Sequence, residues 1–300
     1  MEKPPIPREH GAWVMLYAPL VIAGAAVHPR DWEALVLAAL ASTGVFLAQH
    51  ALALILKGSN RSRGVEAVAA GHSPGAARRS PIGGWFFRMG SHPAAPWLGL
   101  YLALAALGGV PLILAYQRWQ LLLPAGVALG LWGVHSFLRI WPPRRRWDRT
   151  VWGEALGVTA LGLTAPAAWV AAKGSLQAEA WVIWGACVLY FSSAIFHVRM
   201  ILEAAKVKQP LTWNLRLRLA RHNLLYHGLL LTVVAAGGVA VGGRPGLLGA
   251  LAFAPGILRA LYATAKLNTK LPPLKRLGLL ETLYSCWFVV LLVFALNAGA

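Results

Sequence analysis

The chain has 300 residues, of which 58% are hydrophobic and only 13% are charged, and its formal net charge is +18. In soluble globular proteins about a quarter of the residues are charged, so this composition argues against an ordinary soluble protein. Because the basic residues lie in short segments beside apolar runs, the charge indicates membrane lipids as partners and argues against nucleic acid.

Nine apolar runs follow one another along the chain. Each is close to the roughly 20 residues that a helix needs to cross the hydrocarbon core of a bilayer. They occupy residues 11–27, 32–56, 97–116, 120–138, 151–172, 180–201, 223–242, 246–265 and 279–298. The sequence therefore predicts an all-α, polytopic membrane protein, with nine transmembrane helices in a single domain over residues 1–300.

The distribution of Lys and Arg predicts the orientation of these helices. If the N-terminus is cytoplasmic, all but four of the 28 basic residues lie on cytoplasmic segments or at the cytoplasmic ends of helices. The exceptions are Arg30, Arg118, Lys173 and Arg244. Positive residues are retained on the cytoplasmic side, so we expect an integral plasma (inner) membrane protein with its N-terminus inside and its C-terminus outside.

Two segments bear on this topology. Ala23-Gly24-Ala25 resembles a signal-peptidase site, but an acidic, proline-containing stretch precedes the apolar run, so we expect the first helix to be retained. The longest cytoplasmic connection is predicted over residues 57–96. Since irregular backbone is not tolerated in lipid, we expect this loop to lie at the surface and cap a cavity.

Ionisable side chains gather at the predicted cytoplasmic ends of the helices, and the opposite halves carry few charges. Because a charge in the bilayer is costly, such residues usually face the interior of a bundle or a wet cavity. We therefore expect a cytoplasm-facing cavity, with carboxylates as metal ligands or proton acceptors, Arg as anion binder and His as acid, base or ligand. The candidate catalytic residues are Glu66, His197 and Glu203, and the candidate ligand-binding residues are Glu9, His10, His50, Arg61, Arg63, Arg199, His222 and Glu281.

Simpler interpretations of single residues stay open. Arg199 and Glu203 are four residues apart on one predicted helix, a spacing at which opposite charges neutralise each other. Arg221 and Arg259 lie near helix ends, where long basic side chains extend toward lipid headgroups.

Three segments resemble a known family. Pro7-Arg8-Glu9-His10-Gly11-Ala12-Trp13-Val14-Met15-Leu16, followed by Pro19, is similar to the start of YwiC-like family membrane proteins. Tyr190-Phe191-Ser192-Ser193 before His197-Val198-Arg199, and Lys275-Arg276-Leu277-Gly278 before Glu281, are similar to the same family. This resemblance spans essentially the whole chain and implies a membrane protein, without an established activity.

The predicted topology also resembles the UbiA-type intramembrane prenyltransferases. Those enzymes have nine helices, and aspartate-rich motifs after helices two and six hold magnesium on an isoprenyl diphosphate. Here the corresponding segments carry one carboxylate each, Glu66 and Glu203. The resemblance thus implies a UbiA-like bundle, whereas the clustered oxygen ligands that Mg²⁺ requires are missing.

Three classes of function remain open. The first is a divergent UbiA-like transferase, and the second is a non-catalytic protein that binds a lipid, quinone or haem, or assists assembly in a respiratory membrane. The third is a small-anion transporter, although that class favours polar or broken helices at the membrane midplane. Both Mg²⁺ and haem stay open as cofactors; His50, His135, His197, His222 and His227 are the candidate axial ligands for haem.

Among these classes we favour binding of an amphipathic ligand in the cytoplasm-facing cavity, either an isoprenoid-like compound or an anionic lipid. Its isoprenoid-like tail would lie between apolar helices, while its polar head would meet the basic, histidine-containing layer.

Overall fold

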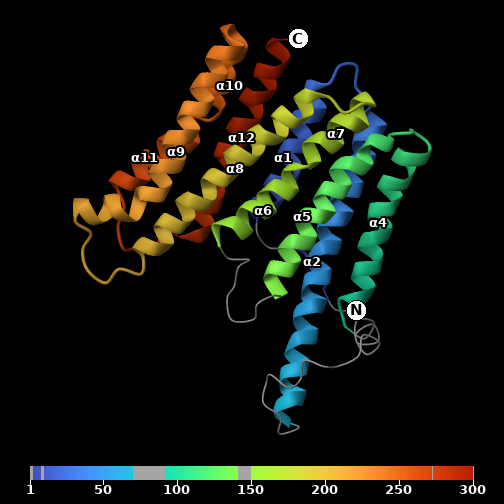
Figure 1. Ribbon diagram of the computed structural model, residues 1–300, viewed down its shortest axis with the longest axis horizontal. Helices are drawn as coiled ribbons and strands as arrows, with labels where there is room; N and C mark the ends of the chain where they lie inside the picture. The colour runs from blue at the N-terminus through green and yellow to red at the C-terminus, as the bar shows by residue number, and fades with distance from the viewer. Residues whose placement is uncertain (1–2, 8–9, 70–91, 141–149, 272, 300) are drawn as a thin grey trace. The chain divides into compact units, whose positions relative to one another are not determined.

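The computed structural model describes residues 3–7, 10–69, 92–140, 150–271 and 273–299, which form helices and their connections (Figure 1). Side chains are described over the same residues except at 10, 57–69, 139–140 and 274–276. Two compact units divide the chain. The first contains Met1–Arg8 and Val36–Gln117, and the second contains Glu9–Leu35 and Arg118–Ala300.

The first unit consists of most of α2 (Trp32–Ala69) together with α4 (Ala95–Leu114). Two glycines allow these helices to approach closely. A Cβ atom on Gly44 would lie 2.4 Å from the backbone nitrogen of Ala105, and one on Gly108 would lie 2.3 Å from the carbonyl oxygen of Leu37. Small residues are the usual means of helix packing in membranes, where no hydrophobic force acts between helices.

Helix α2 is longer than the sequence predicts. Its apolar part, Trp32–Leu56, has the predicted bounds, but the helix continues to Ala69. The first thirteen residues of the connection predicted over 57–96 are therefore helical. They are polar, so hydrophobic periodicity gave no signal for a helix there.

The second unit contains the remaining helices. They are α1 (His10–Ala26), the short 3₁₀ helix η2 (Trp119–Leu121), α5 (Leu122–Ile140), α6 (Val151–Gly162), α7 (Thr164–Lys173), α8 (Ala178–Ala204), α9 (Trp213–Val241), α10 (Gly243–Ala252), α11 (Ala254–Ala265) and α12 (Leu274–Ala298). Helix α1 contacts α6, α7, α8 and α12 and buries Leu16, Ile22 and Ala23 against them. The first helix is therefore part of the core of this unit.

The helices match the predicted membrane spans closely. Among the described residues, eight helical segments are long and apolar enough to cross a bilayer, and the shorter apolar helix Gly11–Ala26 stands where the first of nine was predicted. Apart from the polar extension of α2, the largest difference is at α9, which begins at Trp213, ten residues before the predicted run. Large apolar side chains such as Leu229, Val239 and Phe294 are more than half exposed, as expected where lipid is the solvent.

Two of these spans are broken helices, whereas the sequence predicts one continuous helix for each. Helices α6 and α7 meet at Leu163, and α10 and α11 meet at Phe253 (Figure 1). Pro166 and Pro255 follow these breaks by three and two residues. Because proline has no amide hydrogen and its ring clashes with the preceding turn, it interrupts the helical hydrogen bonds.

A tryptophan from a neighbouring helix satisfies a carbonyl at each break. The Leu251 carbonyl receives no helical hydrogen bond from Pro255, and it accepts one from Nε1 of Trp287 on α12 at 3.1 Å. In α6, the Leu163 amide donates to the carbonyls of two nearer residues. In a regular helix the Leu163 amide would donate to the Thr159 carbonyl. That carbonyl accepts a hydrogen bond from Nε1 of Trp184 on α8 at 3.1 Å. Since an unsatisfied carbonyl in lipid costs several kcal/mol, these indoles stabilise the breaks.

Candidate functional site

Four helices of the second unit carry polar side chains that are buried in the bundle. We call this group the polar cluster; it consists of Ser193 and His197 on α8, Asn223 and His227 on α9, Arg259 on α11, and Glu281 on α12. The two α8 residues and the two α9 residues are at most 3% exposed. Within each helix the two members are four residues apart, so each pair lies on one helix face.

Arg259 joins three helices within the polar cluster. Its Nη1 atom donates a hydrogen bond to Oε1 of Glu281, and its Nη2 atom donates to Oγ of Ser193 at 3.3 Å. The guanidinium also lies 5.9 Å from the centre of the Tyr284 ring. The Arg259 side chain is only 9% exposed and that of Glu281 is 24% exposed. An arginine this deeply buried requires a paired carboxylate, because burying a single charge in a membrane bundle is costly.

The two histidines lie beside this ion pair. His197 is within electrostatic range of both Arg259 and His227. The Nδ1 atom of His227 lies 2.8 Å from the carbonyl oxygen of Asn223, so Nδ1 carries the proton and donates. The other ring nitrogen of His227 then has a free lone pair and is an acceptor.

Several polar atoms of this cluster have no hydrogen-bond partner within the described part of the chain. They are Nε of Arg259, Nδ1 of His197, Nε2 of His227, and both polar side-chain atoms of Asn223. Buried polar groups are nearly always hydrogen-bonded, so a set of five such atoms on adjacent helices is unusual. These atoms are therefore candidates for hydrogen bonds to water or to a bound group.

Aromatic rings border the polar cluster along α8 and α12. Tyr190 stacks on Phe288 with ring centres 4.0 Å apart. Phe191 contacts both of these rings at a steep angle, and so does Phe253. The Tyr190 hydroxyl lies close to that of Ser285. Phe253 is the residue at the break between α10 and α11, so the broken span and the polar cluster share one packed region.

Two side chains from the predicted site, those of His197 and Glu281, belong to the polar cluster. Arg199 lies on α8 near His197, and its Nε atom donates to Oε2 of Glu154 on α6 at 3.0 Å. That bond joins two helices, unlike the neutralisation within one helix considered for Arg199 and Glu203. Glu203 is exposed near the end of α8.

The other predicted residues are more scattered. His222 is exposed on α9 and accepts a hydrogen bond from Arg221. His50 is half-buried on α2, in the first unit. The helical extension of α2 contains Arg61, Arg63 and Glu66, and His10 begins α1. The side chains of these four residues lie outside the described part of the structure, and so does the whole of Glu9. Convergence of these residues with Arg199 and Glu203 therefore stays a prediction.

Arg259 was not among the predicted site residues, and extension of its side chain toward lipid headgroups was left open as one interpretation. The structure places it inside the bundle, because Glu281 on α12 neutralises it. Ser193, Asn223 and His227 were also outside the predicted site. A signal for them is present in the sequence, because each belongs to a pair of polar residues four positions apart. The pairs are Ser193 with His197 and Asn223 with His227.

Within the described part of the chain, no three His, Cys, Asp or Glu side chains are grouped as metal ligands would be. His135, one of the candidate haem ligands, has its Nδ1 atom 3.1 Å from the carbonyl oxygen of Gly153.

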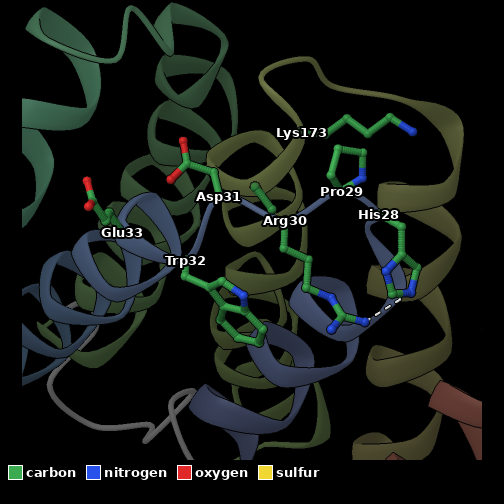
Figure 2. A pocket seen from close by; sticks show the side chains of 8 residues that line it. His28, Pro29, Arg30, Asp31, Trp32, Glu33 and Lys173 are labelled. Atoms are coloured by element: carbon green, nitrogen blue, oxygen red, sulfur yellow. Dashed lines mark hydrogen bonds between the residues drawn. The ribbon is translucent and has the colours of Figure 1, made fainter.

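An open concavity of about 620 Å³ lies elsewhere, where α1 is followed by α2 and α7 ends (Figure 2). It is lined by residues 28–33, Ala172 and Lys173. Figure 2 shows the Arg30 guanidinium turned toward His28, and Arg30 also donates to the carbonyls of Ala25 and Val27. These bonds fix the end of α1. The concavity is at the end predicted to be extracytoplasmic, so it is not the cytoplasm-facing cavity, which stays a prediction.

The long apolar helices, the polar side chains enclosed by them and the proline breaks together define an integral, polytopic, all-helical membrane protein. A family model described as YwiC-like protein matches residues 6–169, which is more than half of the chain. The chain belongs to this YwiC-like family. Searches of curated proteins and of solved structures found no match. The matched range contains the opening motif and ends before the polar cluster.

Proposed function

We propose that this YwiC-like protein binds an amphipathic membrane ligand, whose polar head lies in the polar cluster and whose isoprenoid-like tail lies between apolar helices. One observation carries this proposal: five buried polar atoms without partners in the described structure belong to the same polar cluster as the Arg259–Glu281 ion pair, and one of them is Nε of Arg259 itself. Buried polar groups stabilise a protein only when they are hydrogen-bonded, so a polar ligand at this place would be favoured.

The charges of the cluster favour an uncharged head group. Arg259 is neutralised by Glu281, so an anion would add an uncompensated charge in a medium of low dielectric constant. The atoms without partners include donors, such as Nε of Arg259, and acceptors, such as Oδ1 of Asn223. A head that carries carbonyl and hydroxyl oxygens, as a quinone and its reduced form do, matches both kinds of atom.

The proposal is tested by purifying the protein from its native membrane and identifying bound lipids by mass spectrometry and absorption spectroscopy. We expect an isoprenoid-tailed compound at about one molecule per chain in the wild type and much less in Asn223→Leu. Asn214→Leu, at an exposed position on the same helix, is the matched control and should retain the compound. Equal retention in both variants would contradict binding at the polar cluster, and a Soret band would identify haem instead.

Transport of a small solute is the second candidate, and the two broken spans favour it. Discontinuous helices are characteristic of secondary transporters, in which the breaks form substrate sites and allow half-helices to move. The break at Phe253 is six residues before Arg259 on the same span. Vesicles reconstituted with the protein should then accumulate acetate, nitrate or phosphate faster than protein-free vesicles. Equal uptake with and without protein would refute anion transport and leave ligand binding.

A further inference from the structure

A basic surface lies at the end of the helices that carry the polar cluster. It is formed by the connection from α8 to α9, the first turns of α9 and the segment that follows α11. We call it the basic platform; its exposed cations are Lys206, Lys208, Arg218, Arg221, Lys266 and Lys270. Across residues 201–221 and 265–271, all of which are described, the one carboxylate is Glu203.

The basic platform is a folded structure. Met200, Ala204, Ala220 and Leu267 form a buried apolar cluster, with Leu211 from the connection packed against it. The connections around α8, α9 and α11 are thereby held together by a small core of their own.

Hydrogen bonds fix the backbone of the platform further. Arg216 donates from Nη1 to the carbonyl oxygen of Ala265 at 3.0 Å, which joins α9 to the last residue of α11. The amides of Lys206 and Val207 donate to carbonyls in the last turn of α8, and the Lys270 amide donates to the Asn268 side chain at 2.9 Å. The cations are therefore presented from an ordered backbone, which lowers the entropy cost of binding an anion with several of them.

Apolar side chains beside these cations indicate what the platform faces. Trp213 and Leu217 begin α9 and are 55% and 38% exposed. Exposed tryptophan next to lysine and arginine, at the end of an apolar span, is typical of the interface between lipid headgroups and water. A soluble anion would leave these two side chains in water, whereas a lipid surface covers them.

We propose that the basic platform is a binding surface for anionic phospholipid headgroups of the bilayer leaflet next to it. The phosphates would be held by the lysine and arginine side chains, while Trp213 and Leu217 lie among the upper parts of the acyl chains. This proposal does not depend on a ligand in the polar cluster.

Native mass spectrometry of the purified full-length protein, loaded with equal amounts of phosphatidylglycerol and phosphatidylcholine, tests the proposal. We expect wild type to retain phosphatidylglycerol preferentially. Each lysine removed should weaken this preference by roughly fivefold at low salt, because a cation near an anionic membrane surface contributes a factor of that order. The test variant is Lys266→Gln/Lys270→Gln. Its matched control, Lys173→Gln/Arg244→Gln, removes two exposed cations elsewhere in the same unit.

A loss of phosphatidylglycerol retention in the platform variant, with retention unchanged in the control, would support the proposal. Equal loss in both variants would show that net charge alone is responsible and would overturn it. Equal retention of the two lipids by the wild type would also overturn it.

Discussion

At the scale of single residues, Arg259 determines much of what the second unit can do. It bonds to Glu281 and Ser193, and it lies within electrostatic range of both buried histidines. A cation in this position is stable only because α12 supplies a carboxylate. The apolar bundle therefore contains a strongly polar region that carries no net charge when both histidines are neutral.

Removing one partner of this ion pair should destabilise the protein strongly. We expect Arg259→Met or Glu281→Leu to cost about 3–5 kcal/mol, because each leaves one charge buried and uncompensated. The double variant should lose much less than the sum of the two. Thermal unfolding in detergent measures these differences, and strictly additive losses would contradict a direct pair.

The Asp31–Arg118 pair provides a control for that experiment. It has a similar composition, with a distance of 3.3 Å, but its side chains are 28% and 22% exposed. Arg259 is only 9% exposed, whereas water reaches both partners of the Asp31–Arg118 pair, and such screening weakens an ion pair toward the roughly 0–1 kcal/mol of exposed pairs. Arg118→Met should therefore change the unfolding temperature clearly less than Arg259→Met does.

At the scale of the helices, the breaks at Leu163 and Phe253 follow a common pattern. In both spans a proline follows the break, and a tryptophan on the next span donates to a carbonyl just before it. The hydrogen bonds that a continuous helix makes internally are thus partly replaced by bonds between helices. A broken span depends on its neighbours more than an unbroken one does.

A double-mutant cycle between Trp287 and Pro255 tests this dependence. Trp287→Phe should destabilise the protein by about 1 kcal/mol, because the Leu251 carbonyl loses its indole donor. In a Pro255→Ala background the restored amide can donate to Leu251, so the same change should cost less. If Trp287→Phe costs the same in both backgrounds, the indole does not replace the missing helical bond.

The crossing of α2 and α4 allows a second test at this scale. Gly44→Ala and Gly108→Ala should each destabilise the first unit by about 1–3 kcal/mol, because the added methyl group overlaps the backbone of the facing helix. Gly99→Ala on α4, where a Cβ would meet no atom of the described structure within 4 Å, should be neutral. Unfolding of the three variants in detergent gives the comparison, and equal effects would argue against close packing at these glycines.

At the scale of the whole molecule, the apolar spans establish an integral membrane protein, and the charge distribution predicts its orientation. Reporter fusions after residues 75, 145, 210 and 272 should give cytoplasmic signals, and a fusion after Ala300 should give an extracytoplasmic one. The reason is that all but four of the basic residues lie on one side of the predicted topology. An extracytoplasmic signal at residue 145 would refute this orientation.

The fold class and the positions of the spans could be predicted from the sequence, because hydropathy is a property of a continuous segment. A run such as residues 32–56 must be satisfied by lipid or protein whatever its neighbours are, and the structure confirms these bounds. The family could be predicted for the same kind of reason, since the motif from Pro7 to Leu16 is local, and the family model covers it.

The polar cluster and the helix breaks, in contrast, were decided only by the tertiary structure. Whether Arg259 reaches a headgroup or a carboxylate depends on Glu281, which lies 22 residues away on another helix. The sequence places both near helix ends but does not specify which faces meet. Likewise, Pro255 marks a weak point in a helix, and the packing of α12 brings the Trp287 indole to the Leu251 carbonyl at the break there. Segments determine where a chain crosses a membrane, whereas contacts between segments determine which of its polar groups come together.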